Sequence, residues 1–175
     1  MPDTNLCTHY ASGGIEVKAS SVHGMGSFAT ESIRKGRRVG KYRGVVMDGI
    51  QHSIMFSGTK RSLYSLLAWE SPSGRLTLTI DSSDDACPKH LQNWTKYIND
   101  YRNTGKQPNV QFVGPSASVV TLRDIEAGEE LLIDYGEQYW TGMQKQTTTK
   151  QEEGSAFQAS VLEGGYCLLK SAPSA

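Results

Sequence analysis

The sequence predicts a mostly β fold with few, short helices, and two patterns lead to this prediction. From Ile15 to about Trp140, apolar residues recur in short bursts bounded by Gly, Asp, Ser or Asn, as in chains of many short strands. Residues 75–80 alternate apolar and polar side chains, which is typical of a half-buried strand. We therefore expect one β-rich domain over residues 15–140, after a polar lead-in over residues 1–14.

Apolar runs rich in Val, Ile, Leu and Tyr mark the other expected strands, and turn residues separate them. Strands are expected over residues 15–17, 39–46, 75–80, 109–113, 118–122 and 130–134. Residues 63–69 are compatible with either a strand or a helix. A helix of one or two turns is expected within 88–98, because Leu91, Trp94 and Ile98 are spaced i, i+3 and i+7.

The composition changes beyond Trp140. Residues 141–175 contain few large apolar side chains and include a run of three threonines at 147–149. Such a segment buries too little apolar surface to fold by itself, so we expect a largely flexible tail. A weak return of structure is expected near 161–162 and 166–169.

The chain has 175 residues with 18 Lys or Arg and 18 Asp or Glu, so its formal charge is zero. This balance argues against direct binding of nucleic acid through overall positive charge. Three widely spaced cysteines, Cys7, Cys87 and Cys167, make no disulfide framework and favour a reducing, intracellular setting. No apolar run approaches the roughly 18 residues of a membrane span, so no membrane partner is expected.

Two Cys and His pairs raise the question of a zinc site, because these residues are its usual ligands. The pairs are Cys7 with His9 and Cys87 with His90. Neither has CxxC spacing, and isolated pairs of this kind are usually incidental. We therefore expect no metal.

Three segments carry the candidate chemistry. Gly24 and Gly26 flank Met25, and glycines at this spacing let a backbone approach a ligand closely, although alone they are typical of a tight connection. Residues 93–100 read NWTKYIND, and residues 128–140 read GEELLIDYGEQYW. Taken singly, an Asn near a helix end is usually a cap and a Tyr at a strand end is usually a packing residue.

In this order, the three segments resemble the SET-domain protein lysine methyltransferases. Residues 20–44, SSVHGMGSFATESIRKGRRVGKYRG, are similar to the opening of that family, and residues 121–140, TLRDIEAGEELLIDYGEQYW, are similar to its closing segment. The resemblance spans about residues 15–140 and implies a SET-domain fold, with several small β-sheets around a knot-like C-terminal segment. It also implies transfer of a methyl group from S-adenosyl-L-methionine to a lysine side chain.

The central segment departs from the commonest family form, which reads Asn-His-Ser. Here Asn99 is followed by Asp100. The segment NWTKYIN, residues 93–99, is more similar to the matching segment of the PR subgroup, which lacks the His. That subgroup has a Tyr-Ser pair upstream that faces the cofactor, and Tyr64-Ser65 stands at the corresponding place. The zinc-binding cysteines that follow the core in many members are absent, so another segment must close the substrate channel.

The resemblance implies a role for each matching residue. The cofactor site comprises Gly24, Met25, Gly26, Tyr64, Asn99 and Asp100. Tyr135 is the principal catalytic residue, with Tyr42 as a second, and Tyr139 with Trp140 lines the substrate channel. The alternative is a catalytically weak or inactive SET-like module that binds a protein partner, suggested by Asp100 and by the missing cysteines.

The zero net charge conceals two segments of opposite charge. Residues 34–61 hold eight Lys or Arg against Asp48, whereas residues 124–137 hold six acids and no base. Such runs are commonly solvated faces, but an acidic rim near Tyr135 would attract a Lys-rich protein such as a histone tail. The resemblance thus implies a nuclear chromatin regulator. The target lysine, the degree of methylation and the oligomeric state stay open.

Overall fold

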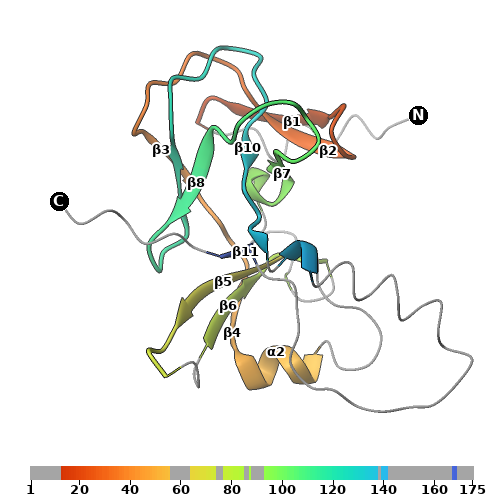
Figure 1. Cartoon of the computed structure of the whole chain (residues 1–175), viewed down its shortest axis with the longest axis vertical. Helices are drawn as coiled ribbons and strands as arrows, with labels where there is room; N and C mark the ends of the chain where they lie inside the picture. Colours follow the sequence, from red (N-terminus) through yellow and green to blue (C-terminus); the bar gives the residue numbers. More distant parts are fainter. Residues whose placement is uncertain are drawn as a thin grey trace, which may run out of the picture.

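The structure is a computed structural model that describes residues 13–55, 64–73, 77–84, 87, 93–137, 139–141 and 167–168. The described strands form small, separate sheets, and helical structure is short, as the sequence predicts. Figure 1 shows the sheet of β4, β5 and β6 together with α2 in the lower half of the view, and the other sheets in the upper half. Among the described residues, no helix is long and apolar enough to cross a membrane.

The glycine segment lies in a hairpin. Strands β1 (Ile15–Ala19) and β2 (Met25–Ala29) pair antiparallel, so that Lys18 faces Gly26 and Ala19 faces Met25. Gly24 stands in the turn just before β2, with a φ of 49°, in the left-handed region that glycine adopts without strain. The hairpin therefore presents the Gly24 backbone at its end.

A three-stranded sheet has the order β3-β9-β8, where β3 is Arg38–Lys41, β8 is Val110–Val113 and β9 is Ser118–Thr121. Strands β8 and β9 form an antiparallel hairpin, and Val110 and Val119 are fully buried within it.

The lower sheet has the order β11-β5-β6-β4. Strands β4 (Val45–Asp48), β5 (Ser65–Glu70) and β6 (Thr77–Asp81) are antiparallel neighbours, and β11 (Cys167–Leu168) pairs parallel to β5. Helix α2 (Gly49–Met55) follows β4 directly. The starts of β4 and β5 both lie opposite the end of β6.

The centre of the molecule is built around residues 94–100. A 3-10 helix, η2 (Trp94–Tyr97), is capped by Asn93, whose side chain accepts from the Thr95 N–H. It leads into β7 (Asn99–Asp100), which pairs parallel to β10 (Leu132–Ile133). This pairing brings the central and closing segments of the sequence together.

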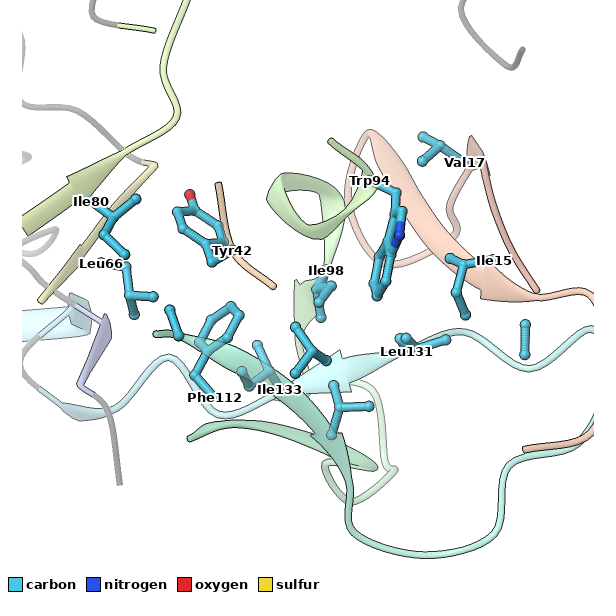
Figure 2. Packing of buried hydrophobic residues seen from close by; sticks show 14 of the residues in the cluster. Ile15, Val17, Tyr42, Leu66, Ile80, Trp94, Ile98, Phe112, Leu131 and Ile133 are labelled. Atoms are coloured by element: carbon cyan, nitrogen blue, oxygen red, sulfur yellow. The ribbon is translucent and has the colours of Figure 1, made fainter. Parts of the chain in front are cut away.

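One apolar core connects these sheets. Trp94 is 2% exposed and is among the largest fully buried side chains of the described residues. Figure 2 draws Trp94 with Ile15 and Ile98 on either side, and Phe112 beside Tyr42. Because Trp94 belongs to η2, its burial fixes the position of the residues that follow it.

The expected strand over 39–46 is wrong in one respect. These residues form two strands, β3 and β4, which are separated at residues 42–44. Strand β3 pairs with β9, whereas β4 pairs with β6. A side chain at Gly44 would collide with the Asp81 carbonyl, and the Tyr42 N–H donates to the Ala117 carbonyl. Local alternation does not reveal such a change of partner.

Other boundaries differ by less. Of the two structures compatible with residues 63–69, the strand is the one found, as β5. The strand expected over 130–134 is shorter and is β10, because Glu130 only forms an isolated bridge with Phe28. The expected helix within 88–98 is confirmed only as η2, and residues 88–92 lie outside the described residues. Helix α2 was not predicted. In the expected tail, β11 falls within 166–169, and 161–162 lies outside the described residues.

Candidate active site

Asn99 holds the glycine segment in place. Its side-chain Nδ2 lies 3.1 Å from the carbonyl oxygens of His23 and Met25, and 2.9 Å from Glu130 Oε1. The side chain is 7% exposed, so these hydrogen bonds are shielded from water. The predicted central and opening segments therefore meet, through the amide of Asn99.

Glu130 stabilises the same arrangement and was not predicted as a site residue. Its Oε1 accepts from Asn99 and, at 2.7 Å, from the Ser20 hydroxyl, which lies before the glycine segment. A side chain at Gly26 would collide with this oxygen, whereas nothing lies within 4 Å of the corresponding position at Gly24. Packing against Glu130 thus explains why a glycine stands at position 26. Of the two glycines, only Gly24 has open space beside its backbone.

Asp100 is bonded to the closing segment. Its Oδ2 accepts from the Tyr135 N–H at 2.7 Å, and its Oδ1 accepts from the Arg102 N–H at 2.8 Å. Charged acceptors make stronger hydrogen bonds than neutral ones. With both oxygens used in this way, the carboxylate acts as an anchor for the backbone of Tyr135.

Tyrosines gather around one pocket, which encloses about 360 Å³ of atom-free space, part of it open to solvent. Its lining residues come from distant parts of the chain and are mostly aromatic or apolar: Tyr42, Tyr64, Ser65, Leu66, Thr95, Lys96, Ile98, Phe112, Tyr135 and Tyr139. The two predicted catalytic tyrosines and the predicted channel residue Tyr139 therefore share a pocket.

Backbone carbonyls fix both catalytic candidates. The Tyr135 hydroxyl donates to the Ile98 carbonyl at 2.7 Å, and the Tyr42 hydroxyl donates to the Tyr64 carbonyl at 2.6 Å. The Tyr139 ring packs edge-on against Tyr135, with ring centroids 4.7 Å apart. These contacts limit ring rotation at the pocket wall.

Trp140 and Tyr64, the other predicted residues of the channel and the cofactor site, have different surroundings. Trp140 packs against Tyr139 and, with the Arg102 guanidinium 5.7 Å from its ring, does not line the tyrosine pocket. Its Nε1 is buried and has no hydrogen-bond partner among the described residues. Tyr64, predicted beside the cofactor, lines the tyrosine pocket and is 39% exposed.

A buried polar cluster supports the wall at Tyr64-Ser65. The Ser65 hydroxyl donates to Asp81 Oδ2 and lies 2.8 Å from His52 Nε2. Asp81 also accepts from the Ser83 N–H at 2.9 Å. His52 Nε2 also lies 3.8 Å from Asp81 Oδ2, so one ring nitrogen faces both the serine and the carboxylate. In a hydrolytic triad the carboxylate holds the other ring nitrogen, and we therefore interpret this group as a structural network.

The acidic segment is largely bonded within the chain. Glu129 pairs with Arg123, and this hydrogen bond holds the pKa of the Glu129 carboxyl below its usual value. Asp124 accepts from the Lys35 N–H, and Glu130 is buried. The expected acidic rim near Tyr135 is therefore weaker than the sequence count suggests.

Of the candidate zinc ligands, Cys87 belongs to the described residues. Cys7, His9 and His90 lie outside the described residues. Burial raises the pKa of the Cys87 thiol, which disfavours the thiolate that binds metals. Among the described residues, no three His, Cys, Asp or Glu side chains are grouped as metal ligands would be.

The small sheets, the β7–β10 pair and the anchored closing tyrosine define a SET-type domain, and comparison with known proteins agrees. The model of the SET domain family matches residues 24–136. This is more than half of the chain, which therefore belongs to the SET domain family.

Two individual proteins are similar to this chain. A SET domain-containing protein of Phaeosphaeria nodorum (strain SN15) is 25% identical over 122 residues, which are 69% of this chain and 17% of that protein. The chain thus spans under a fifth of that relative's length. The methyltransferase domain of human PR domain-containing protein 2 aligns with a TM-score of 0.50 and 25% identity, covering 73% of this chain and 80% of that structure.

Proposed function

We propose that this protein is a protein-lysine N-methyltransferase that uses S-adenosyl-L-methionine. The observation that carries the proposal is the run of Ile98, Asn99 and Asp100. These consecutive residues bind, in turn, the hydroxyl of Tyr135, the glycine segment and the backbone N–H of Tyr135. One stretch of backbone therefore sets the cofactor loop and the catalytic tyrosine relative to each other.

The residues at the glycine segment fit a flat, polar cofactor in part. Gly24 leaves open space beside its backbone, and Asn99 and Met25 stand next to it. Gly26 and Asp100 are explained by contacts within the protein, so we assign binding to the backbone of Gly24 and Met25, which the Asn99 amide positions. When bound, S-adenosyl-L-methionine supplies an electrophilic methyl group on a positively charged sulfur.

The tyrosine pocket suits a lysine side chain. A lysine amine must lose its proton to react, and its ordinary pKa is about 10.4. Apolar and aromatic walls such as Ile98, Phe112 and Tyr42 exclude water, which disfavours the ammonium and lowers that pKa. No dedicated base among the pocket residues is required.

Tyr135 orients the reacting groups. Its hydroxyl hydrogen is committed to the Ile98 carbonyl, which leaves the oxygen as an acceptor toward the pocket. There it can accept a hydrogen bond from the substrate amine and hold the nitrogen in line with the methyl group. Tyr42, which also lines the pocket, performs a similar, weaker role, with its hydroxyl held by the Tyr64 carbonyl.

The proposed substrate is a Lys-rich protein, most simply a histone tail, and the proposed location is the nucleus. Both rest on the family, as does the proposed extent of the catalytic domain, residues 15–140. The partly neutralised acidic segment gives them little additional support.

The test is transfer of a labelled methyl group to core histones and to Lys-containing peptide arrays. We expect transfer by the wild type and a loss of about 100-fold or more in Tyr135→Phe, which retains the ring but removes the positioning hydroxyl. Absence of transfer above the Tyr135→Phe background would overturn the proposal. Stabilisation by S-adenosylhomocysteine without transfer would instead indicate the catalytically inactive module.

A further inference from the structure

Exposed cations gather along one edge of the β3-β9-β8 sheet. Among the described strands β3 pairs only with β9, so it forms that edge, at the left of the upper half of Figure 1. The turn before β3, the strand itself and the residues just after it carry six exposed Lys or Arg side chains: Arg34, Lys35, Arg37, Arg38, Lys41 and Arg43. We call these six residues the basic strip.

A β-bulge places the two cations of β3 on one face of the sheet. Side chains three residues apart on a regular strand point to opposite faces. The register between β3 and β9 shifts within β3, so that Arg38 pairs with Val120 and Lys41 pairs with Ser118. Paired residues share a face, and Val120 and Ser118 are two residues apart on β9. Arg38 and Lys41 therefore project from the same face, roughly 7 to 10 Å apart.

The sheet adds no negative charge to this face. Its three strands read RVGK, VQFV and SVVT, without Asp or Glu. None of the six side chains of the basic strip forms an ion pair with another residue in the part of the chain that the structure describes. These cations can therefore bind an external anion without first breaking an ion pair.

The described acids near the basic strip lie at its turn end. The isolated bridge between Ile33 and Ile125 puts residues 124–126 beside the turn before β3. Asp124 accepts there from the Lys35 N–H. The exposed acids of these neighbouring segments are Glu31, Asp124 and Glu126. Six bases against these three acids leave a local excess of three positive charges, mostly along β3.

A phosphate backbone fits this surface better than a protein partner does. The centre of a protein interface is apolar and poor in charge. The exposed large apolar side chains of the described residues all lie outside the basic strip and its sheet: Val46, Ile50, Ile54, Met55, Tyr64 and Leu78. Four of the six strip residues are arginines, whose planar guanidinium binds phosphate oxygens in pairs. One strand of duplex DNA carries a charge about every 3.4 Å along the axis, so both cations of β3 can reach phosphates of the same strand.

We propose that the basic strip binds the phosphate backbone of duplex DNA, independently of the base sequence. The inference goes beyond methyl transfer and does not depend on it. The zero net charge of the whole chain does not oppose this binding. Salt screens charges more than about 8 Å apart in physiological solution, so the local excess decides the interaction.

The test is the fluorescence anisotropy of a labelled DNA duplex titrated with the full chain at several salt concentrations. We expect a Kd of about 1 to 10 µM at about 50 mM salt. With four to six phosphate contacts, log Kd should rise with log salt with a slope of roughly 4 to 5. Two duplexes of unrelated sequence should bind within about threefold of each other.

Two matched double variants separate the strip from the net charge. Lys35→Gln/Lys41→Gln removes two lysines of the strip, whereas Lys18→Gln/Lys106→Gln removes two lysines elsewhere, so the net charge is the same in both. The first should weaken binding about tenfold and lower the slope by about 2, and the second should stay within about twofold of the wild type. Arg37→Gln/Arg38→Gln should act as the first pair does.

Absence of binding at about 50 mM salt would overturn the inference, as would equal losses in the two lysine double variants. Tighter binding of poly-L-glutamate, or of vesicles of phosphatidylcholine and phosphatidylserine, than of the duplex would also overturn it, in favour of an acidic protein or a membrane. Lys35 and Lys41 do not line the tyrosine pocket, so transfer to a free peptide should be unchanged in their double variant. Failure of DNA binding therefore leaves the proposed function standing, and failure of transfer leaves this inference standing.

Discussion

Replacing Asp100 with alanine removes a buried carboxylate that accepts two backbone hydrogen bonds, from Arg102 at 2.8 Å and from Tyr135 at 2.7 Å. A hydrogen bond to a charged group contributes about 1.5 to 3 kcal/mol, and an orphaned buried donor adds a desolvation cost. The Arg102 N–H lies in a turn, where water can replace the lost acceptor. We therefore expect Asp100→Ala to lower the free energy of unfolding by about 2 to 4 kcal/mol.

Asp100→Asn is the matched control. Its single amide oxygen can accept from one of the two N–H groups, so a loss of about 1 to 2 kcal/mol is expected. The effect of Asp100→Asn on cofactor affinity distinguishes two roles of Asp100, an anchor for Tyr135 and a ligand of the cofactor. An anchor leaves the Kd for S-adenosylhomocysteine within about threefold of the wild type, whereas loss of a ligand costs about tenfold or more.

Urea unfolding followed by tryptophan fluorescence gives the stabilities, and titration calorimetry gives the affinities. Our reasoning about Asp100 would be refuted by an Asp100→Ala protein that unfolds within about 0.5 kcal/mol of the wild type. It would equally be refuted if Asp100→Asn kept wild-type stability and lost cofactor affinity tenfold.

Three other predictions follow from the geometry. Trp94→Ala should lower the free energy of unfolding in urea by about 3 to 5 kcal/mol, because Trp94 is 2% exposed in the core. A decrease below about 1 kcal/mol would contradict the burial of this side chain. Gly26→Ala should lower the Tm more than Gly24→Ala, since a methyl at Gly26 collides with the buried Glu130 carboxylate, whereas one at Gly24 meets open space and adds only the strain of a positive φ. The reverse order would be inconsistent with the structure. Glu129→Gln should cost at most about 1 kcal/mol at neutral pH, as the Arg123 pair is partly exposed. The pKa of Glu129 is lowered in the folded protein, so the pair stabilises the fold above the unfolded pKa of about 4.3, and this stabilisation is lost as the pH falls through the folded pKa. If the unfolding free energies of wild type and variant instead differed by the same amount down to acid pH, this prediction would be disproved.

The sequence predicts the class of fold because short strands leave a local trace. The alternation over 75–80 agrees with β6, and the runs near 110 and 120 agree with β8 and β9. The separation of β3 from β4 depends on a contact between Gly44 and the Asp81 backbone, 37 residues apart, and leaves no local signal. Strand β5 is similar, since its identity depends on pairing with β6.

The sequence indicates which residues gather at the candidate site better than it indicates the hydrogen bonds they make. Tyr42 and Tyr135 line one pocket, and Asn99 contacts the glycine segment, so residues from distant motifs lie together, while their roles stay predictions. The partners of Asp100 were not foreseeable, because a carboxylate bonds whichever N–H the fold places near it. Lys96 was missed for a related reason, since its charge is typical of a solvated face and only the structure buries it.

The central claim is that one stretch of backbone joins a cofactor loop to a pocket that receives lysine. The most direct measurement is tandem mass spectrometry of Lys-containing peptides incubated with the protein and S-adenosyl-L-methionine carrying a deuterated methyl group. We predict label on lysine side chains only, with at most trace label from Tyr135→Phe. Label on no lysine, or equal labelling by wild type and Tyr135→Phe, would contradict the account.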